Sequence, residues 1–211
     1  MAAIGAPLPQ APYSHLAWDE RIVAHVSFTG APGYRIFSPK ERAPELIRRL
    51  EAAGAVAADP ESARVVRIEH LRPRYGEDVF DSTLAMETQQ NHALHFSKGC
   101  YLGQEIVERV RSRGHLNRVL VGLEIDSMQP PAPGTILTLE GNEVGKITSA
   151  AFSWVVRKVV GMAYVRAQHA APKTVLMADG SAAITTPLAA PLQVPEAAEP
   201  TGAGSAGRRC G

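Results

Sequence analysis

The stretch Val119-Leu120-Val121-Gly122-Leu123-Glu124-Ile125 is the first of several short β-rich runs in the second half of the chain. The others are residues 135–139, 143–149, 159–165 and 174–177. Turn-forming residues separate these runs, namely Pro130-Pro131, Gly134 and Gly141-Asn142. Many short strands at near-even spacing are typical of a small barrel or sandwich. We therefore expect a small C-terminal β-barrel at residues 117–186.

A disordered tail is expected to follow the barrel. Residues 187–211 consist mostly of Ala, Pro, Gly and Glu, with almost no large apolar residue. A segment of this composition cannot bury enough apolar surface to offset the entropy lost on ordering.

Length and charge restrict the class of protein. The 211 residues suffice for a real core in one large domain or two small ones. A formal net charge of +1 and an isoelectric point near 7.9 give no broad reason to expect nucleic acid or a membrane surface as partner. We find no signal sequence and no run that could span a bilayer, and we expect a soluble, cytoplasmic protein.

The first half of the chain has an α+β pattern. Residues 1–20 are proline-bearing and expected to form an irregular arm, and residues 21–116 a domain of strands and helices. Two β-rich runs flank a glycine-bearing turn, and two helical patterns follow them; these four segments are residues 22–28, 34–38, 40–53 and 60–71. We expect an antiparallel sheet with both helices on one face. A two-stranded sheet is only marginally stable, so a partner chain or an upstream segment is expected to supply further strands.

The stretch Lys98-Gly99-Cys100-Tyr101-Leu102-Gly103-Gln104-Glu105 is the strongest candidate for chemistry. It precedes a short basic helix expected at residues 106–113, so Cys100 lies just ahead of a helix N-terminus, where the dipole and unpaired N–H groups favour thiolate. Glu105 works in the opposite direction, because a nearby carboxylate disfavours thiolate. The only other cysteine is Cys210. Two thiols provide neither a disulfide framework nor a self-contained zinc or iron–sulfur site, and a reducing compartment fits best.

Other charged and histidine side chains remain open to two interpretations. His92, His95 and His115 could serve Cys100 as a base, but none has a spacing that identifies it, and no metal site is expected. Two groups of charged side chains could lie on the solvated surface, or their arginines could bind a carboxylate ligand through the planar guanidinium group. These groups are the pair Arg67 and Glu69 and the trio Arg109, Arg111 and Arg113.

The eight residues 98–105 resemble the signature K-G-C-Y-x-G-Q-E of the YgfZ-type folate-binding proteins. These proteins assist iron–sulfur cluster assembly and repair and are relatives of the aminomethyltransferase of the glycine cleavage system. Supporting stretches occur in order over about residues 20–167. They are Gly33-Tyr34-Arg35-Ile36, Arg67-Ile68-Glu69 with Gly76-Glu77-Asp78, Val144-Gly145-Lys146-Ile147-Thr148-Ser149 with Phe152-Ser153, and Ala163-Tyr164-Val165-Arg166.

The resemblance implies a partial ferredoxin-like antiparallel sheet with helices, joined to the C-terminal barrel around a folate-sized cavity. It implies tetrahydrofolate as cofactor and iron–sulfur proteins or cluster carriers as partners. The catalytic residues would be Cys100 as the working thiol with Lys98, Gln104 and Glu105. The folate-binding residues would be Tyr101, Gly103, Arg109, Arg111 and Glu69.

Two departures from the family pattern qualify this expectation. Family members carry a further segment of roughly domain size ahead of the matching region, so the chain looks N-terminally shortened. In aminomethyltransferases an acidic residue follows a Y-T-G turn and holds the pterin, whereas Ala31 follows Phe28-Thr29-Gly30 here. The sequence thus favours a folate-binding accessory protein for iron–sulfur clusters. The alternatives are a tetrahydrofolate-dependent aminomethyltransferase-like enzyme, against which Ala31 argues, and a non-catalytic truncated interaction module.

Overall fold

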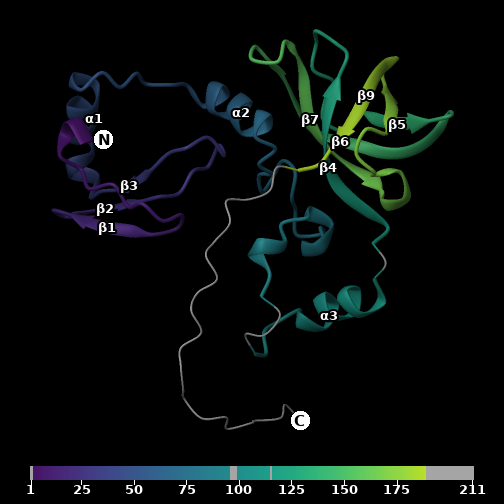
Figure 1. Ribbon diagram of the computed structural model, residues 1–211, viewed down its shortest axis with the longest axis horizontal. Coiled ribbons are helices and arrows are strands. Elements are labelled where there is room, and N and C mark those ends of the chain that lie inside the picture. The colour runs from purple at the N-terminus through teal and green to yellow at the C-terminus, as the bar shows by residue number, and fades with distance from the viewer. Residues whose placement is uncertain (1, 96–98, 115, 189–211) are drawn as a thin grey trace.

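A computed structural model describes residues 2–95, 99–114 and 116–188, apart from the side chains of Ala2, His92, Val110, Arg111 and Arg113. The expected disordered tail at residues 187–211 lies outside the described residues except for its first two. Figure 1 shows helix α2 between two bodies, a small sheet with helix α1 on one side and a barrel on the other. None of the described helices is long and apolar enough to cross a membrane.

The N-terminal sheet has one more strand than the sequence predicts. Within residues 2–95, strands β1 (His15–Trp18), β2 (Arg21–Ala24) and β3 (Arg35–Phe37) pair antiparallel in that order. The pairing of β2 with β3 confirms the predicted strand pair. The prediction of an irregular arm over residues 1–20 is wrong for β1 and for the 3-10 turn Ala2–Ile4. Asp19-Glu20 closes the β1–β2 hairpin with Asp19 at a φ of 51°, and this turn carries no glycine to signal it.

Helix α1 (Ala43–Ala52) covers the sheet, whereas helix α2 (Pro60–Glu69) does not. A 3-10 turn, Lys40–Arg42, leads into α1, and buried Leu46 packs with Trp18 and Val23 of the sheet. The expectation that both helices lie on one face of the sheet is therefore wrong. The apolar stripe of α2, centred on fully buried Ile68, packs against the barrel instead.

Local residues set the ends of α2. The Asp59 side chain accepts a hydrogen bond from the Ser62 backbone N–H at 2.7 Å, and Pro60 occupies the first turn, where no N–H partner is needed. The helix ends at Glu69, and Leu71 follows with a φ of 50°. A Cβ on Gly122 would lie 2.5 Å from Leu71 Cδ1, so glycine at this position lets the end of α2 approach the barrel closely.

The predicted C-terminal barrel is confirmed. Within residues 116–188 the strands form a closed antiparallel barrel in the order β4-β7-β6-β5-β8-β9. Their bounds are β4 Arg118–Ile125, β5 Ile136–Leu139, β6 Asn142–Ser153, β7 Lys158–Arg166, β8 Val175–Ala178 and β9 Ser181–Thr186. A 3-10 turn, Ala167–His169, follows β7. Strand β9, absent from the prediction, closes the barrel by pairing with both β4 and β8.

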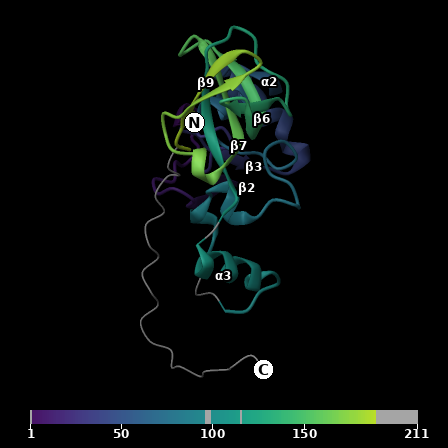
Figure 2. The same ribbon diagram turned by 90° about the vertical axis from the view of Figure 1, so that its right-hand side faces the viewer.

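Helix α3 (Gln104–Arg113) ends the long connection between α2 and the barrel. The helix expected at residues 106–113 is confirmed and begins two residues earlier. The connection also contains two 3-10 turns, Ala85–Thr88 and Asn91–Ala93. Figures 1 and 2 both place α3 apart from α2 and from the N-terminal sheet.

Candidate functional site

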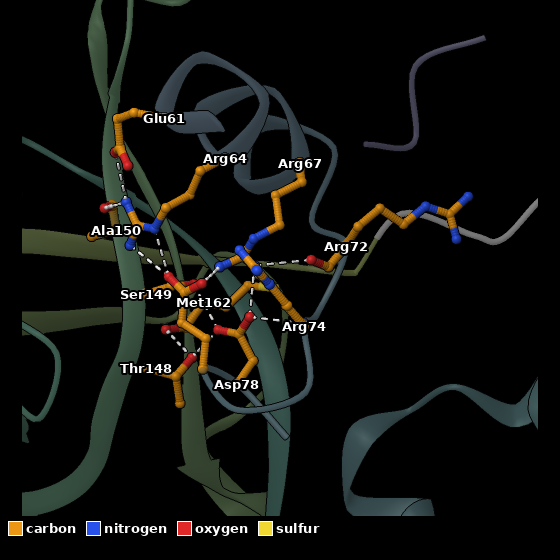
Figure 3. A network of polar contacts seen from close by, with 11 residues as sticks. Glu61, Arg64, Arg67, Arg72, Arg74, Asp78, Thr148, Ser149, Ala150 and Met162 are labelled. Atoms are coloured by element: carbon orange, nitrogen blue, oxygen red, sulfur yellow. Dashed lines mark hydrogen bonds and ion pairs between the residues drawn. The ribbon is translucent and has the colours of Figure 1, made fainter. Parts of the chain in front are cut away.

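A buried carboxylate, Asp78, joins α2 to the barrel. Its Oδ2 accepts hydrogen bonds from Arg67 Nη1 at 2.6 Å and from the Arg74 backbone N–H at 3.0 Å. Its Oδ1 accepts from the hydroxyls of Thr148 and Ser149, each at 2.6 Å (Figure 3). Asp78 is fully buried and Arg67 is 5% exposed, so the contacts operate at low dielectric, where a hydrogen bond is electrostatically stronger than in water.

Glu77, the residue before Asp78, forms further ion pairs with the arginines of α2. Glu77 Oε1 accepts from Arg64 Nε at 2.7 Å, and Glu77 Oε2 pairs with Arg67 Nη2 at 2.5 Å. Arg64 also pairs with Glu61, one turn earlier on α2, at 3.1 Å. Burial raises the pKa of Glu77, but hydrogen bonds and charge from Arg64 and Arg67 outweigh it, so the pKa lies below its ordinary value of 4.5. Glu77 is thus held ionised, and Arg67 faces two carboxylates.

A cavity lies beside this network, and we call it the α2 cavity. Its volume is about 600 Å³. The lining residues come from the loop after β2, from α2 and from the segment that follows α2; they are Phe28, Thr29, Pro60, Ala63, Arg64, Arg67, Pro73, Arg74 and Tyr75. Such a volume is within the usual range for small-molecule sites.

The α2 cavity combines exposed aromatic rings with arginine side chains. Phe28 is 73% exposed and Tyr75 is 68% exposed. The Arg35 guanidinium lies 3.2 Å from the centroid of the Phe28 ring and covers one of its faces. Gly30, at a φ of 85°, brings the Phe28 loop against α2, because a Cβ there would lie 2.6 Å from His70 Cβ. The cavity can therefore present an aromatic surface and positive charge to one ligand.

The cysteine loop forms a turn at the start of α3. Gln104 Oε1 accepts a hydrogen bond from the Tyr101 backbone N–H at 3.0 Å, so this side chain caps the turn. Gly103 has a φ of 87°, a conformation that L side chains rarely adopt. Cys100 lies just ahead of the helix, as predicted, and it is exposed.

The structure gives an oxidation state for Cys100, which the sequence alone leaves open. Cys100 is the only cysteine among the described residues, and it is disulfide-bonded. Two cysteines cannot form several disulfides, but they are enough for a single disulfide. A role for Cys100 as a thiolate therefore requires prior reduction.

The predicted site residues do not all lie together. Tyr101, Gly103 and Gln104 share one turn, and Glu105 and Arg109 lie on the exposed surface of α3. Glu69 ends α2 and is partly buried. Because α3 lies apart from α2 in Figures 1 and 2, the structure does not bring Glu69 to the cysteine loop. Lys98, and the side chain of Arg111, lie outside the described residues.

The sequence did not indicate the hydrogen bonds that Asp78 accepts from Thr148 and Ser149. The three residues belong to stretches quoted above, but 70 positions separate Asp78 from Thr148, and the single sequence carries no signal that pairs them. Asp78 also lies in a connection of weak periodicity, where a carboxylate is normally solvated. Among the described residues, no group of three or more His, Cys, Asp or Glu side chains could hold a metal ion.

Comparison with known proteins gives a family match for the barrel. Residues 118–185 match the family model described as the glycine cleavage T-protein C-terminal barrel domain. The chain is 32% identical over 153 residues to an aminomethyltransferase of Rubrobacter xylanophilus, covering 72% of the chain and 41% of that protein. It is 31% identical over 155 residues to an aminomethyltransferase of Geobacillus kaustophilus, covering 71% of the chain and 42% of that protein.

A solved structure extends the likeness to the fold of almost the whole chain. The crystal structure of glycine cleavage system aminomethyltransferase T from Bartonella henselae matches with a TM-score of 0.79 at 21% identity, covering 92% of this chain and 56% of that one. The chain spans about two fifths of the length of the curated relatives named above. The chain therefore has a T-protein-type C-terminal barrel, and its fold and sequence support a relationship to the T-protein superfamily.

Proposed function

We propose that the chain binds a reduced folate in the α2 cavity and acts as an accessory protein in iron–sulfur cluster assembly or repair. The observation that carries the folate part is the combination of exposed aromatic rings and arginines around a cavity of about 600 Å³. Tetrahydrofolate has a pterin with a planar pyrimidine ring, an aromatic linker and a glutamate tail, and each part would have a matching group in this cavity.

The aromatic parts of the folate would pack on Phe28 and Tyr75. Large exposed aromatic side chains are energetically unfavourable in water and gain from stacking with a flat ligand. Arg35 already covers one face of Phe28 at 3.2 Å from the ring centroid and leaves the opposite face to the ligand. Ala31 lies three residues after Phe28 and offers no acidic group to the pterin, so recognition would depend more on stacking than on a carboxylate.

Arg74 is the side chain that would hold the glutamate tail. Arg64 and Arg67 also line the cavity but are already paired with Glu77 and Asp78. The exposed Arg74 side chain makes no ion pair with any described carboxylate. A guanidinium can bind a carboxylate through two parallel hydrogen bonds. This assignment replaces Arg109 and Arg111, because α3 lies apart from α2.

The iron–sulfur part of the proposal rests on residues 98–105. In reduced form, Cys100 would contact a cluster, a cluster carrier or an oxidised thiol. A single thiol cannot complete the ligand set of a cluster, so a partner would supply the other ligands. Arg109, exposed on α3, would contact acidic groups of that partner.

A second candidate, tetrahydrofolate-dependent aminomethyl transfer, is supported about as well. Relatives that match about 70% of the chain are named aminomethyltransferase. The same cavity would then hold the folate that accepts the one-carbon unit. Ala31 argues against this candidate, and a non-catalytic interaction module is the third.

Calorimetric titration with tetrahydrofolate, performed under reducing conditions, tests the shared folate step. We expect saturable binding by the wild-type chain and about tenfold weaker binding by Arg74→Ala, from the loss of a hydrogen bond to a charged group. Arg48→Ala is the matched control, since Arg48 is an exposed arginine on α1 outside the cavity. Absence of binding by a folded sample would leave only the interaction module, and equal effects of the two variants would reject the assignment to Arg74.

Two further assays separate the first two candidates. Turnover of an aminomethyl donor with tetrahydrofolate would establish the transferase. Failure of Cys100→Ala to restore iron–sulfur enzyme activity in cells lacking the chain would support the accessory role, and full rescue by that variant would reject Cys100 as the functional thiol.

A further inference from the structure

A second cavity borders the Asp78 network, against the barrel. Its volume is about 390 Å³, and we call it the Tyr164 cavity. Its lining includes Phe80, Thr83, Arg118, Pro133, Lys146 and Tyr164. The function proposed above makes no use of this cavity.

The barrel strands place the polar groups of this cavity side by side. Lys146 on β6 lies directly across from Tyr164 on β7, and Leu120 on β4 is the other cross-strand partner of Tyr164. Arg118 lies two residues before Leu120, so it shares a face of β4 with it. Its guanidinium lies 4.8 Å from the centroid of the Tyr164 ring. A phenol, a guanidinium and an ammonium group therefore line one cavity.

The Tyr164 hydroxyl has no hydrogen-bond partner in the part of the chain that the structure describes. Tyr164 is 8% exposed, and its Oη is buried with no hydrogen bond to the described part of the chain. The Thr83 side chain lies near this hydroxyl, but no hydrogen bond joins the two groups. The phenol is protonated at neutral pH and can donate, and burial raises the pKa of Tyr164 further above its ordinary value of 10. A buried hydroxyl without a partner is costly, so a ligand that accepts this hydrogen bond would be favoured.

The charges around Tyr164 leave room for an anion. Arg118 Nε and Nη2 pair with Glu87 at 3.1 Å, and Arg166 lies directly across from Arg118 on β7, an unfavourable like-charge pair. Lys146 is exposed and pairs with no described carboxylate. Glu77 lines the cavity, but its carboxylate is held by the α2 arginines; Glu143 lines an adjoining pocket.

We propose that the Tyr164 cavity binds a small organic oxyanion, a carboxylate or a phosphate ester. The oxyanion accepts hydrogen bonds from the Tyr164 hydroxyl and the Lys146 ammonium, and the Arg118 guanidinium adds positive charge. Phe80, which is 48% exposed, and Pro133 form an apolar wall for the body of the ligand. This site is independent of the folate proposal.

Nuclear magnetic resonance of the full chain with ¹³C-labelled tyrosine tests the site. The Tyr164 resonances, assigned by their loss in Tyr164→Phe, are followed during titration with benzoate or with phenyl phosphate at constant ionic strength. We expect a saturable shift with at least one probe, and the probe that binds more tightly identifies the carboxylate or the phosphate. No saturable shift with either probe in the folded protein would overturn the proposal.

Two lysine variants show whether binding is specific. Lys146→Met is expected to weaken binding by about tenfold, because it removes one charged donor. Lys158→Met removes a cation from β7 that pairs with Glu124 and does not line the cavity, so its affinity should equal that of wild type. Equal weakening by both variants would mean that the probes sense only overall charge and would reject the site.

The Tyr164→Phe variant gives a further readout. Its thermal midpoint without ligand should equal or exceed that of wild type, because the lost hydroxyl has no partner, while its affinity for the probe by calorimetry should fall several-fold. A lower midpoint with unchanged affinity would assign the hydroxyl a structural role and overturn its part in binding.

Discussion

Asp78 accepts four hydrogen bonds and faces Arg67 in the interior, between α2 and the barrel. We expect Asp78→Asn to destabilise the protein by about 3–5 kcal/mol, because it removes the charge partner of a buried arginine and turns an amide N–H₂ toward donors. Urea unfolding measures this change. Asp126→Asn, at an exposed aspartate, should change the free energy of unfolding by less than about 0.5 kcal/mol. Similar losses in the two variants would show that the network does not stabilise the fold.

Glu77 gives the stability a dependence on acid pH. Its pKa is lower in the folded chain than its ordinary value of 4.5, so its contribution is fully present above that value and is lost as the pH falls through the lower folded pKa. Glu77→Gln should therefore flatten the decline of unfolding free energy below about pH 5. Urea unfolding at several pH values measures the slope. A variant whose slope matches wild type would rule Glu77 out as a source of this dependence.

The sequence could indicate the parts of the site that depend on neighbouring residues in the chain, and not those that depend on distant ones. The position of Cys100 ahead of a helix followed from glycines and a basic helical pattern close by in the chain. The bonds from Asp78 to Thr148 and Ser149 did not, because they depend on how α2 meets the barrel. The disulfide at Cys100 could not be predicted, because cysteine counts limit the number of bridges and not whether one forms.

The strands that the sequence predicted lie in apolar runs bounded by turn-forming residues. The strands that it missed, β1 and β9, contain the sequences H-L-A-W and S-A-A-I-T-T, whose small and mixed residues give no clear pattern. Both segments become strands because neighbouring strands pair with them: β1 pairs with β2, and β9 pairs with β4 and β8. The place of α2 was missed for a related reason: an apolar stripe predicts that a helix face is buried but not which surface covers it.

The contact between the Phe28 loop and α2 depends on Gly30. A Cβ at Gly30 would lie 2.6 Å from His70 Cβ and 2.9 Å from Arg72 Cγ, and the φ of 85° adds strain. Gly54→Ala is the matched control, because Gly54 has a φ of 90° but open space around its Cβ position. We expect Gly30→Ala to cost about 1–3 kcal/mol more than Gly54→Ala in urea unfolding and to weaken tetrahydrofolate binding. Equal costs would mean that the loop and α2 are not tightly packed.

In the molecule as a whole, α2 is the element that both bodies share. It packs on the barrel through Ile68, is tied to it through Asp78, and meets the Phe28 loop near its end. The α2 cavity thus has walls from distant parts of the chain, whereas the cysteine loop and α3 stand apart from it (Figures 1 and 2). Folate binding and thiol chemistry would then occupy separate places.

Amide hydrogen exchange with and without tetrahydrofolate locates the bound folate directly. If it binds in the α2 cavity, exchange should slow at residues 28–30 and 74–75 and stay unchanged at residues 99–109. Slower exchange at residues 99–109 with none at residues 28–30 would move the folate to the cysteine loop and refute the site proposed in the α2 cavity.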